Sequence, residues 1–62
     1  MNKIKALREQ AGIQQKELAA RAEISQPFLC DLENNRRGAK PETYQRIADA
    51  LGVKVEDLKE VS

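Results

Sequence analysis

Apolar residues recur along this chain at intervals of three and four positions, which is the spacing of one helix face. Glycine and proline, notably Gly12, Pro41 and Gly52, fall between these runs, where helices are expected to begin or end. The alternation that indicates strands does not persist anywhere in the sequence. The pattern therefore predicts an all-α bundle of five short helices, expected at residues 2–10, 15–21, 26–34, 41–51 and 55–60.

Each expected helix has an apolar face that can pack into a shared core. In chain order, the residues expected to point inward are Ile4, Leu7 and Ala11; Leu18, Ala19 and Ala22; Leu29 and Leu32; Tyr44, Ile47, Ala48 and Leu51; and Leu58. A chain of this size buries only about 60% of the surface that its unfolded form exposes. We therefore expect one domain of marginal stability, spanning residues 1–62.

The helix starts carry signals of unequal strength. Ser25 is a good N-cap for the third helix, and Pro41 occupies a favoured first helical position. Gln14, with Glu17 three residues later, forms only a weak version of a capping box.

The connection between the second and third helices is short. Only residues 22–25 join them, which is the length of a helix-turn-helix corner. Ala19 is small enough to let the two helices cross closely, and Ile24 can plug the turn. Tight corners also occur in other small helical domains, so this spacing alone leaves DNA binding open.

The net charge of the chain is close to zero, but its basic residues are unevenly distributed. Eleven basic residues face ten acidic ones, for a net charge of +1. Residues 1–40 carry eight basic and five acidic residues, whereas residues 41–62 carry three basic and five acidic. Arg36, Arg37 and Lys40 lie in a stretch without acids. Any electrostatic attraction for nucleic acid is therefore expected near this stretch.

The residue inventory argues against other classes of protein. Cys30 is the only cysteine, which fits a reducing, intracellular setting and excludes an internal disulfide. No apolar run approaches the roughly 20 residues that span a bilayer, and the N-terminus lacks the apolar stretch of a signal peptide. The chain has no histidine, cysteine cluster or glycine-rich phosphate loop. We therefore expect no enzymatic activity, metal, cofactor, membrane contact or small-molecule ligand.

One long stretch of the sequence has a familiar order. Residues 15–33 read QKELAARAEISQPFLCDLE, with Leu7 and Arg8 upstream and ADALGV at residues 48–53. These elements closely resemble the lambda-repressor-like, Cro/cI-type (XRE) helix-turn-helix family over about residues 3–60. The resemblance implies that the second helix lies across the DNA backbone and that the third enters the major groove. It implies a repressor-like transcriptional regulator that binds double-stranded DNA, cytoplasmic or nucleoid-associated, from a prokaryote or phage.

The resemblance assigns DNA contacts by position. The base-facing positions are Gln26, Pro27, Cys30 and Asp31. The backbone-contacting positions are Gln14, Gln15, Lys16, Ser25, Asn34, Arg36, Arg37 and Lys40. Lys3 and Lys5 are further candidates for outer phosphate contacts. For each of these residues, the plain alternative is a solvated surface position.

Helical geometry supports the same face without the family. At 100° per residue, the positions opposite the inward leucines of the third helix are Pro27, Asp31 and Asn34, with Cys30 beside them and Gln26 and Phe28 at the boundary. A glutamine amide can bond both N6 and N7 of adenine, so Gln26 is the strongest candidate for base readout. Asp31 can accept from cytosine N4. Cys30 is interpreted as a small side chain facing a base, not as a redox sensor.

Three positions depart from the family pattern. Glu23 occupies a turn position often held by glycine, and a left-handed backbone there would cost about 1 kcal/mol. Pro27 has no side-chain hydrogen-bonding group, which weakens direct readout at its position. Lys54 replaces the usual small polar cap of the fifth helix, so we expect that helix to fray.

The resemblance also implies two structural contacts. Arg8 and Glu33, each following an inward leucine, are implied to meet as a partly buried ion pair. One recognition helix reads few base pairs, and this family usually binds two half-sites as a dimer. The apolar residues available for a weak two-fold contact are Val53, Val55, Leu58 and Val61, of which Val55 and Val61 are favoured. Alternatively, all four cap the monomer's core.

Two other functions remain open. The fold can serve as a protein-interaction module such as an anti-repressor, which the near-neutral charge and Pro27 favour and the basic stretch and Gln26 oppose. It can also serve as an antitoxin or as the controller of a restriction–modification operon, which keeps DNA binding but changes its purpose.

Overall fold

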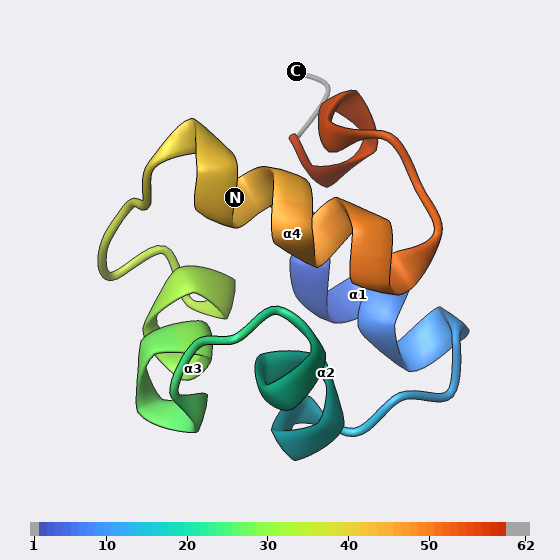
Figure 1. The fold of residues 1–62 in the computed structure, drawn as a ribbon, viewed down its shortest axis with the longest axis horizontal. Coiled ribbons are helices and arrows are strands. Elements are labelled where there is room, and N and C mark those ends of the chain that lie inside the picture. The colour runs from blue at the N-terminus through green and yellow to red at the C-terminus, as the bar shows by residue number, and fades with distance from the viewer. Residues whose placement is uncertain (1, 60–62) are drawn as a thin grey trace.

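A computed structural model describes residues 2–59 of the chain. Within that range the chain forms four α-helices and one 3₁₀ turn: α1 (Ile4–Gln10), α2 (Gln15–Arg21), α3 (Gln26–Glu33), α4 (Pro41–Leu51) and η1 (Val55–Leu58) (Figure 1). No strand occurs among the described residues. The all-α prediction is confirmed, although the fifth element is a 3₁₀ turn and the expected end at residue 60 lies outside the described residues.

α2 contacts two of the other helices. It packs against α3 on one side and against α4 on the other, while α1 contacts α3 and η1 contacts α4 (Figure 1). Leu18, Ala19 and Ala22, at the end of α2 and just beyond it, are all buried. The two alanines allow close approach of the neighbouring helices, as the short corner predicted. α3 is thereby held at one edge of the bundle.

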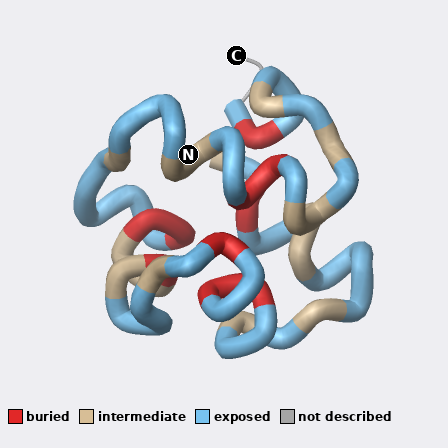
Figure 2. Tube along the Cα trace, in the orientation of Figure 1, coloured by how far each residue is buried: buried red, intermediate tan, exposed pale blue. Residues whose placement is uncertain are grey.

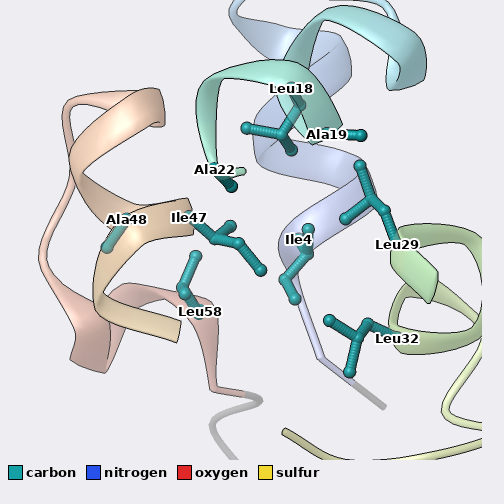
Figure 3. Packing of buried hydrophobic residues seen from close by; sticks show 9 residues of the cluster. All are labelled: Ile4, Leu18, Ala19, Ala22, Leu29, Leu32, Ile47, Ala48 and Leu58. Carbon is teal, nitrogen blue, oxygen red and sulfur yellow. The ribbon is translucent and has the colours of Figure 1, made fainter. Parts of the chain in front are cut away.

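The core lies where the helices meet (Figures 2 and 3). Its buried apolar residues are Ile4, Leu18, Ala19, Ala22, Leu29, Leu32, Ile47, Ala48 and Leu58. Leu7, Tyr44 and Leu51 are only half-buried and pack at its margin. The prediction for Ala11 was wrong, because α1 ends at Gln10 and Ala11 is exposed in the turn that follows.

All four α-helices end in the same backbone turn. In each, a left-handed residue lies one or two positions after the last helical residue, and the residue that follows it donates its N–H to a carbonyl five positions earlier. The left-handed residues are Gly12, Glu23, Asn35 and Gly52. The expected left-handed backbone of Glu23 is therefore confirmed, with φ of 59°.

The helix starts agree only partly with the sequence. The hydroxyl of Ser25 accepts a hydrogen bond from the N–H of Phe28 at 3.2 Å, as expected of an N-cap. The weak capping box at Gln14 is absent, because Glu17 pairs with Arg21 on the same helix instead. Lys54 provides no side-chain cap to the fifth element, as expected, but the carboxylate of Asp57 accepts from the N–H of Lys54 at 3.1 Å.

Candidate nucleic-acid interface

α3 buries one side and exposes the other. Leu29, Leu32 and Glu33 are buried against the rest of the domain. The assigned residues lie on the remaining surface: Gln26, Pro27 and Asn34 are exposed, and Phe28, Cys30 and Asp31 are half-buried. The sequence-based division of this helix into two faces is therefore confirmed. The open face can contact a partner along its whole length.

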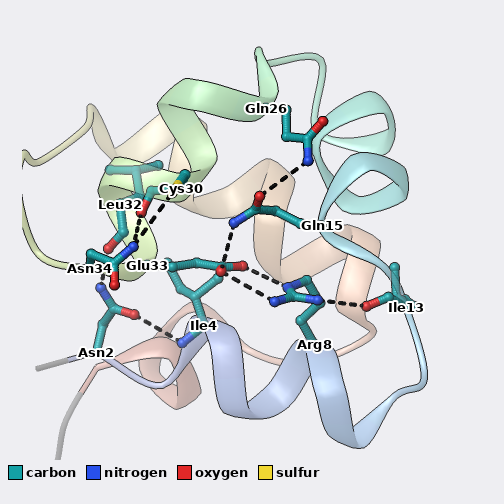
Figure 4. Close-up of polar contacts among 10 residues, drawn as sticks. All are labelled: Asn2, Ile4, Arg8, Ile13, Gln15, Gln26, Cys30, Leu32, Glu33 and Asn34. Atoms are coloured by element: carbon teal, nitrogen blue, oxygen red, sulfur yellow. Dashed lines mark hydrogen bonds and ion pairs between the residues drawn. The ribbon is translucent and has the colours of Figure 1, made fainter.

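A chain of side-chain amides holds the start of α3. Gln26 donates through Nε2 to Oε1 of Gln15 at 3.3 Å, and Gln15 donates through Nε2 to Oε1 of Glu33 at 3.1 Å (Figure 4). The first residues of α2 and α3 are thus side by side. Sequence reasoning assigned Gln15 and Gln26 separately and missed that one orients the other. The matching positions of the two glutamines at their helix starts were the available signal.

The amide chain continues into a buried ion pair. Nε of Arg8 lies 2.7 Å from Oε2 of Glu33, and the two side chains are 11% and 2% exposed. A second guanidinium nitrogen donates to the other carboxylate oxygen at 3.3 Å, and a third donates to the carbonyl of Ile13 at 3.0 Å. Burial of charge is tolerated where every polar atom is paired. The pair implied by the resemblance is present, and it joins α1 to α3.

The end of α3 is held by a second set of amides. Asn34 donates through Nδ2 to the carbonyl of Cys30 at 2.8 Å and lies 3.5 Å from its Sγ (Figure 4). The amide donor of Asn34 is therefore turned back onto its own helix. The carbonyl of Cys30 thus accepts both the backbone N–H of Asn34, at 3.1 Å, and its side-chain amide.

The basic stretch after α3 forms an exposed loop. Arg36, Arg37 and Lys40 are all exposed. The guanidinium carbon of Arg37 lies 4.5 Å from the centre of the Phe28 ring, a cation–π contact that fixes this arginine against α3. An open hollow of about 490 Å³ adjoins it, lined by Phe28, Arg37, Gly38, Ala39, Lys40 and Thr43. Sequence reasoning found the three cations but not this stacking, because the partners lie nine positions apart in different elements.

The remaining assigned residues have different surroundings. Gln14 and Lys16 are exposed at the start of α2, close to the Gln15–Gln26 contact. Ser25 is exposed, although its hydroxyl already caps α3. Lys3 and Lys5 are exposed at the start of α1. The side chains of α2 and α3 that begin these helices therefore form a common surface, whereas nothing in the structure joins the two lysines to it.

The residues considered for a two-fold contact differ in availability. Leu58 is 2% exposed and belongs to the core, so its assignment to a dimer contact was wrong. Val53 and Val55 are half-buried and pack at the margin of the core. Val61 lies outside the described residues.

Among residues 2–59, no three histidine, cysteine or acidic side chains gather as metal ligands would. In the part of the chain that the structure describes, every helix is too short or too polar to cross a membrane.

Known proteins resemble this chain over most of its length. The chain is 40% identical over 58 residues to an HTH-type transcriptional regulator, DdrOP3, of Deinococcus deserti, covering 94% of this chain and 45% of that protein. It is 36% identical over 53 residues to the immunity repressor protein of Bacillus phage phi105, covering 86% of this chain and 37% of the repressor. It is 43% identical over 47 residues to an uncharacterized HTH-type transcriptional regulator, y4dJ, of Sinorhizobium fredii, covering 76% and 61%.

Two facts follow from these comparisons. The chain spans less than half the length of the first two relatives and about three fifths of the third. The sequence model of one family, described as helix-turn-helix, matches residues 4–58, which include all five helical elements. With a face of α3 open beside a basic loop, and with this match over nearly its whole length, the chain belongs to the helix-turn-helix family.

Proposed function

We propose that this domain binds double-stranded DNA sequence-specifically, as the DNA-reading part of a repressor-like transcriptional regulator. The observation that carries the proposal is the open face of α3, fixed at both ends and flanked by a basic loop. The relatives are named as transcriptional regulators and an immunity repressor, which favours the same function. Their names describe no enzyme, in agreement with the expectation from the residue inventory.

Base readout is assigned to the exposed face of α3. The amide of Gln26 can bond N6 and N7 of adenine, and its contact with Gln15 limits the orientations it can adopt before binding. Pro27, Cys30 and Asp31 complete the face. Pro27 has no polar side-chain atom, so preference at its base pair would come from a thymine methyl or from DNA shape.

Affinity is assigned to the residues around that face. Arg36, Arg37 and Lys40 would neutralise phosphates, which strengthens binding to every sequence alike. The exposed start of α2, with Gln14, Gln15 and Lys16, would lie along the same backbone. Ser25 and Asn34, at the two ends of α3, are proposed as flanking contacts.

A weak homodimer would supply the second half-site. Val55 lines a hollow of about 400 Å³ together with Tyr44 and Pro41 of α4, and this hollow offers apolar surface to a second copy. Val53 lies close by in sequence and is half-buried. Because the available surface is small, the contact would be weak in free protein and stronger when both subunits occupy one operator.

Selection of bound sequences from a random duplex pool tests this function. We expect enrichment of a palindromic sequence, since two copies related by two-fold symmetry read two equal half-sites. Enrichment without palindromy would exclude the dimer but keep DNA binding. No enrichment at all would overturn the proposal and favour a protein-interaction module.

The basic loop gives a second, quantitative test. Arg36→Ala combined with Arg37→Ala should weaken binding to all duplexes similarly. It should also reduce the slope of log K against log salt by up to about 2, because each phosphate contact contributes about 0.9. Unchanged affinity and slope in the folded double variant would remove the loop from the interface.

A further inference from the structure

The side chain of Asn2, just before α1, reaches the end of α3. We propose that Asn2 is a positioning residue of the DNA interface: its amide ties the end of α3, and with it the basic loop, to the start of α1. The inference rests on the proposed function for its effect on DNA binding. Its geometry and its effect on the free loop stand apart from that function.

The amide nitrogen of Asn2 reaches both sides of the turn that ends α3. Nδ2 donates to the carbonyl of Leu32 at 2.6 Å and to Oδ1 of Asn35 at 3.2 Å. Leu32 belongs to the last turn of α3, and Asn35 is the left-handed residue that directs the chain out of it. One donor group therefore holds the helix end and the first residue of the loop together.

The turn that Asn2 holds determines where the loop begins. Asn35 has φ of 58°, and the N–H of Arg36 donates to the carbonyl of Asp31 at 2.9 Å. Arg36 and Arg37 follow directly, so the direction of the chain at Asn35 sets the position of both cations. A non-glycine residue in this conformation is held there by its surroundings. Asn2 supplies one of those contacts directly, and it also binds the carbonyl of Leu32, to which the N–H of Asn35 donates at 3.2 Å.

Asn2 is itself anchored on the scaffold. Its Oδ1 accepts a hydrogen bond from the N–H of Ile4 at 3.0 Å, which caps the start of α1 (Figure 4). The next residue, Lys3, donates its N–H to the carbonyl of Leu58 in η1 at 2.9 Å. Ile4 and Leu58 are both buried in the core. Contacts with α1 and η1 thus hold Asn2 in place, and the amide of Asn2 in turn holds the start of the loop.

Loss of the amide would free the loop in the unbound protein. DNA would then have to order a loop that the native protein already holds in place, and binding weakens by the cost of that ordering. A typical hydrogen bond contributes about 0.5–1.5 kcal/mol, which corresponds to a change in affinity of about twofold to tenfold.

Two substitutions separate the two roles of Asn2. Asn2→Ser keeps a side-chain oxygen that can accept from the N–H of Ile4 but is too short to reach Leu32, whereas Asn2→Ala removes both contacts. If Asn2 positions the loop, both variants bind DNA about twofold to tenfold more weakly than the native chain, with an unchanged salt slope because the loop, once ordered, contacts the same phosphates. If Asn2 only caps α1, the serine variant behaves as the native chain does. Mass spectrometry checks that the two variants and the native chain begin at the same residue, so that any difference between them reflects the side chain at position 2.

Limited trypsin digestion without DNA provides the independent readout. We expect faster cleavage after Arg36 and Arg37 in both variants, and unchanged cleavage after Arg21 in α2. Gln45→Ala is the matched control, because it removes a surface hydrogen bond to Asp49 at 2.9 Å on α4. It should alter neither cleavage nor DNA affinity.

The two measurements distinguish the possible failures. Faster cleavage in the Asn2 variants would support the positioning of the loop even if the native chain bound no duplex, and only the proposed function would then fail. Native rates of cleavage at Arg36 and Arg37 in both variants would overturn the positioning role. Native affinity in both variants, with a native chain that binds DNA, would overturn its effect on the interface.

Discussion

The helices of the scaffold and those of the helix-turn-helix end in the same turn but with different residues. α1 and α4 are followed by Gly12 and Gly52, each with φ of 72°. α2 and α3 are followed by Glu23 and Asn35, with φ of 59° and 58°. A Cβ added at either glycine would meet no atom within 4 Å, so the backbone conformation and not the space calls for glycine there.

The difference places backbone strain on both sides of the recognition helix. A left-handed L-residue costs about 1–2 kcal/mol, and asparagine tolerates the conformation better than glutamate does. Asn35 also offers its side-chain oxygen to Asn2 at 3.2 Å, a contact that glycine could not make. Glu23 is exposed. In the turn after α3, the contact made by Asn35 therefore offsets part of the backbone strain. In the turn before α3, the strain at Glu23 is larger.

The largest expected effect on stability comes from removing the ion pair that joins α1 to α3. Arg8→Ala removes the partner of a carboxylate that is 2% exposed, so it should lower the free energy of unfolding by about 3–5 kcal/mol. Chemical denaturation measures the change. Arg46→Ala is the control, because its pair with Glu42 lies on the surface and should be worth less than about 1 kcal/mol. If both variants lost the same free energy of unfolding, the Arg8–Glu33 pair between α1 and α3 would contribute no more to stability than a surface ion pair.

The next largest effect is expected on α3 itself, which lies between the turns at Glu23 and Asn35. Gln26→Ala should weaken binding to the preferred duplex by about 1–3 kcal/mol and relax preference at one base pair in each half-site. Sequence selection on the variant measures both. A selected profile identical to that of the native chain would remove Gln26 from base readout and leave its contact with Gln15 as a purely structural one.

Substitution at a scaffold corner should destabilise. Gly52→Ala forces an L-residue into φ of 72°, which should cost about 1–2 kcal/mol although the added methyl group meets nothing. Thermal unfolding measures the loss. If Gly52→Ala were as stable as the native chain, this turn would accept an L-residue without strain. The difference between the glycine and non-glycine turns would then have no effect on stability.

The smallest effects have the opposite sign and test the contrast most sharply. Glu23→Gly should stabilise the domain by up to about 1 kcal/mol, because it relieves the left-handed residue. Asn35→Gly should gain less or nothing, since it also removes the contact with Asn2 and replaces a residue that tolerates this conformation. Both are measured by denaturation under one condition. Equal gains at the two corners would contradict a role for the Asn35 side chain.

The sequence already contained the elements of the fold. The apolar period predicted the four α-helices, with bounds exact for α2 and within two residues for α1. Ser25 and Pro41 marked helix starts, and the glycines marked helix ends, because these signals depend on contacts within four residues. The exposed side of α3 followed from the same period. These features are local, so the order of residues was sufficient to determine them.

The contacts that orient the interface depended on tertiary structure. The ion pair joins residues 25 positions apart, the Gln15–Glu33 bond spans 18, and the bond from Asn2 to Leu32 spans 30. Each requires two helices to meet in a particular register. Packing also made the fifth element a 3₁₀ turn where the sequence predicted a short helix. The sequence by itself determined which residues form helices and which face α3 exposes, and tertiary packing decided which side chains meet, because contacts between distant residues exist only after the helices have packed together.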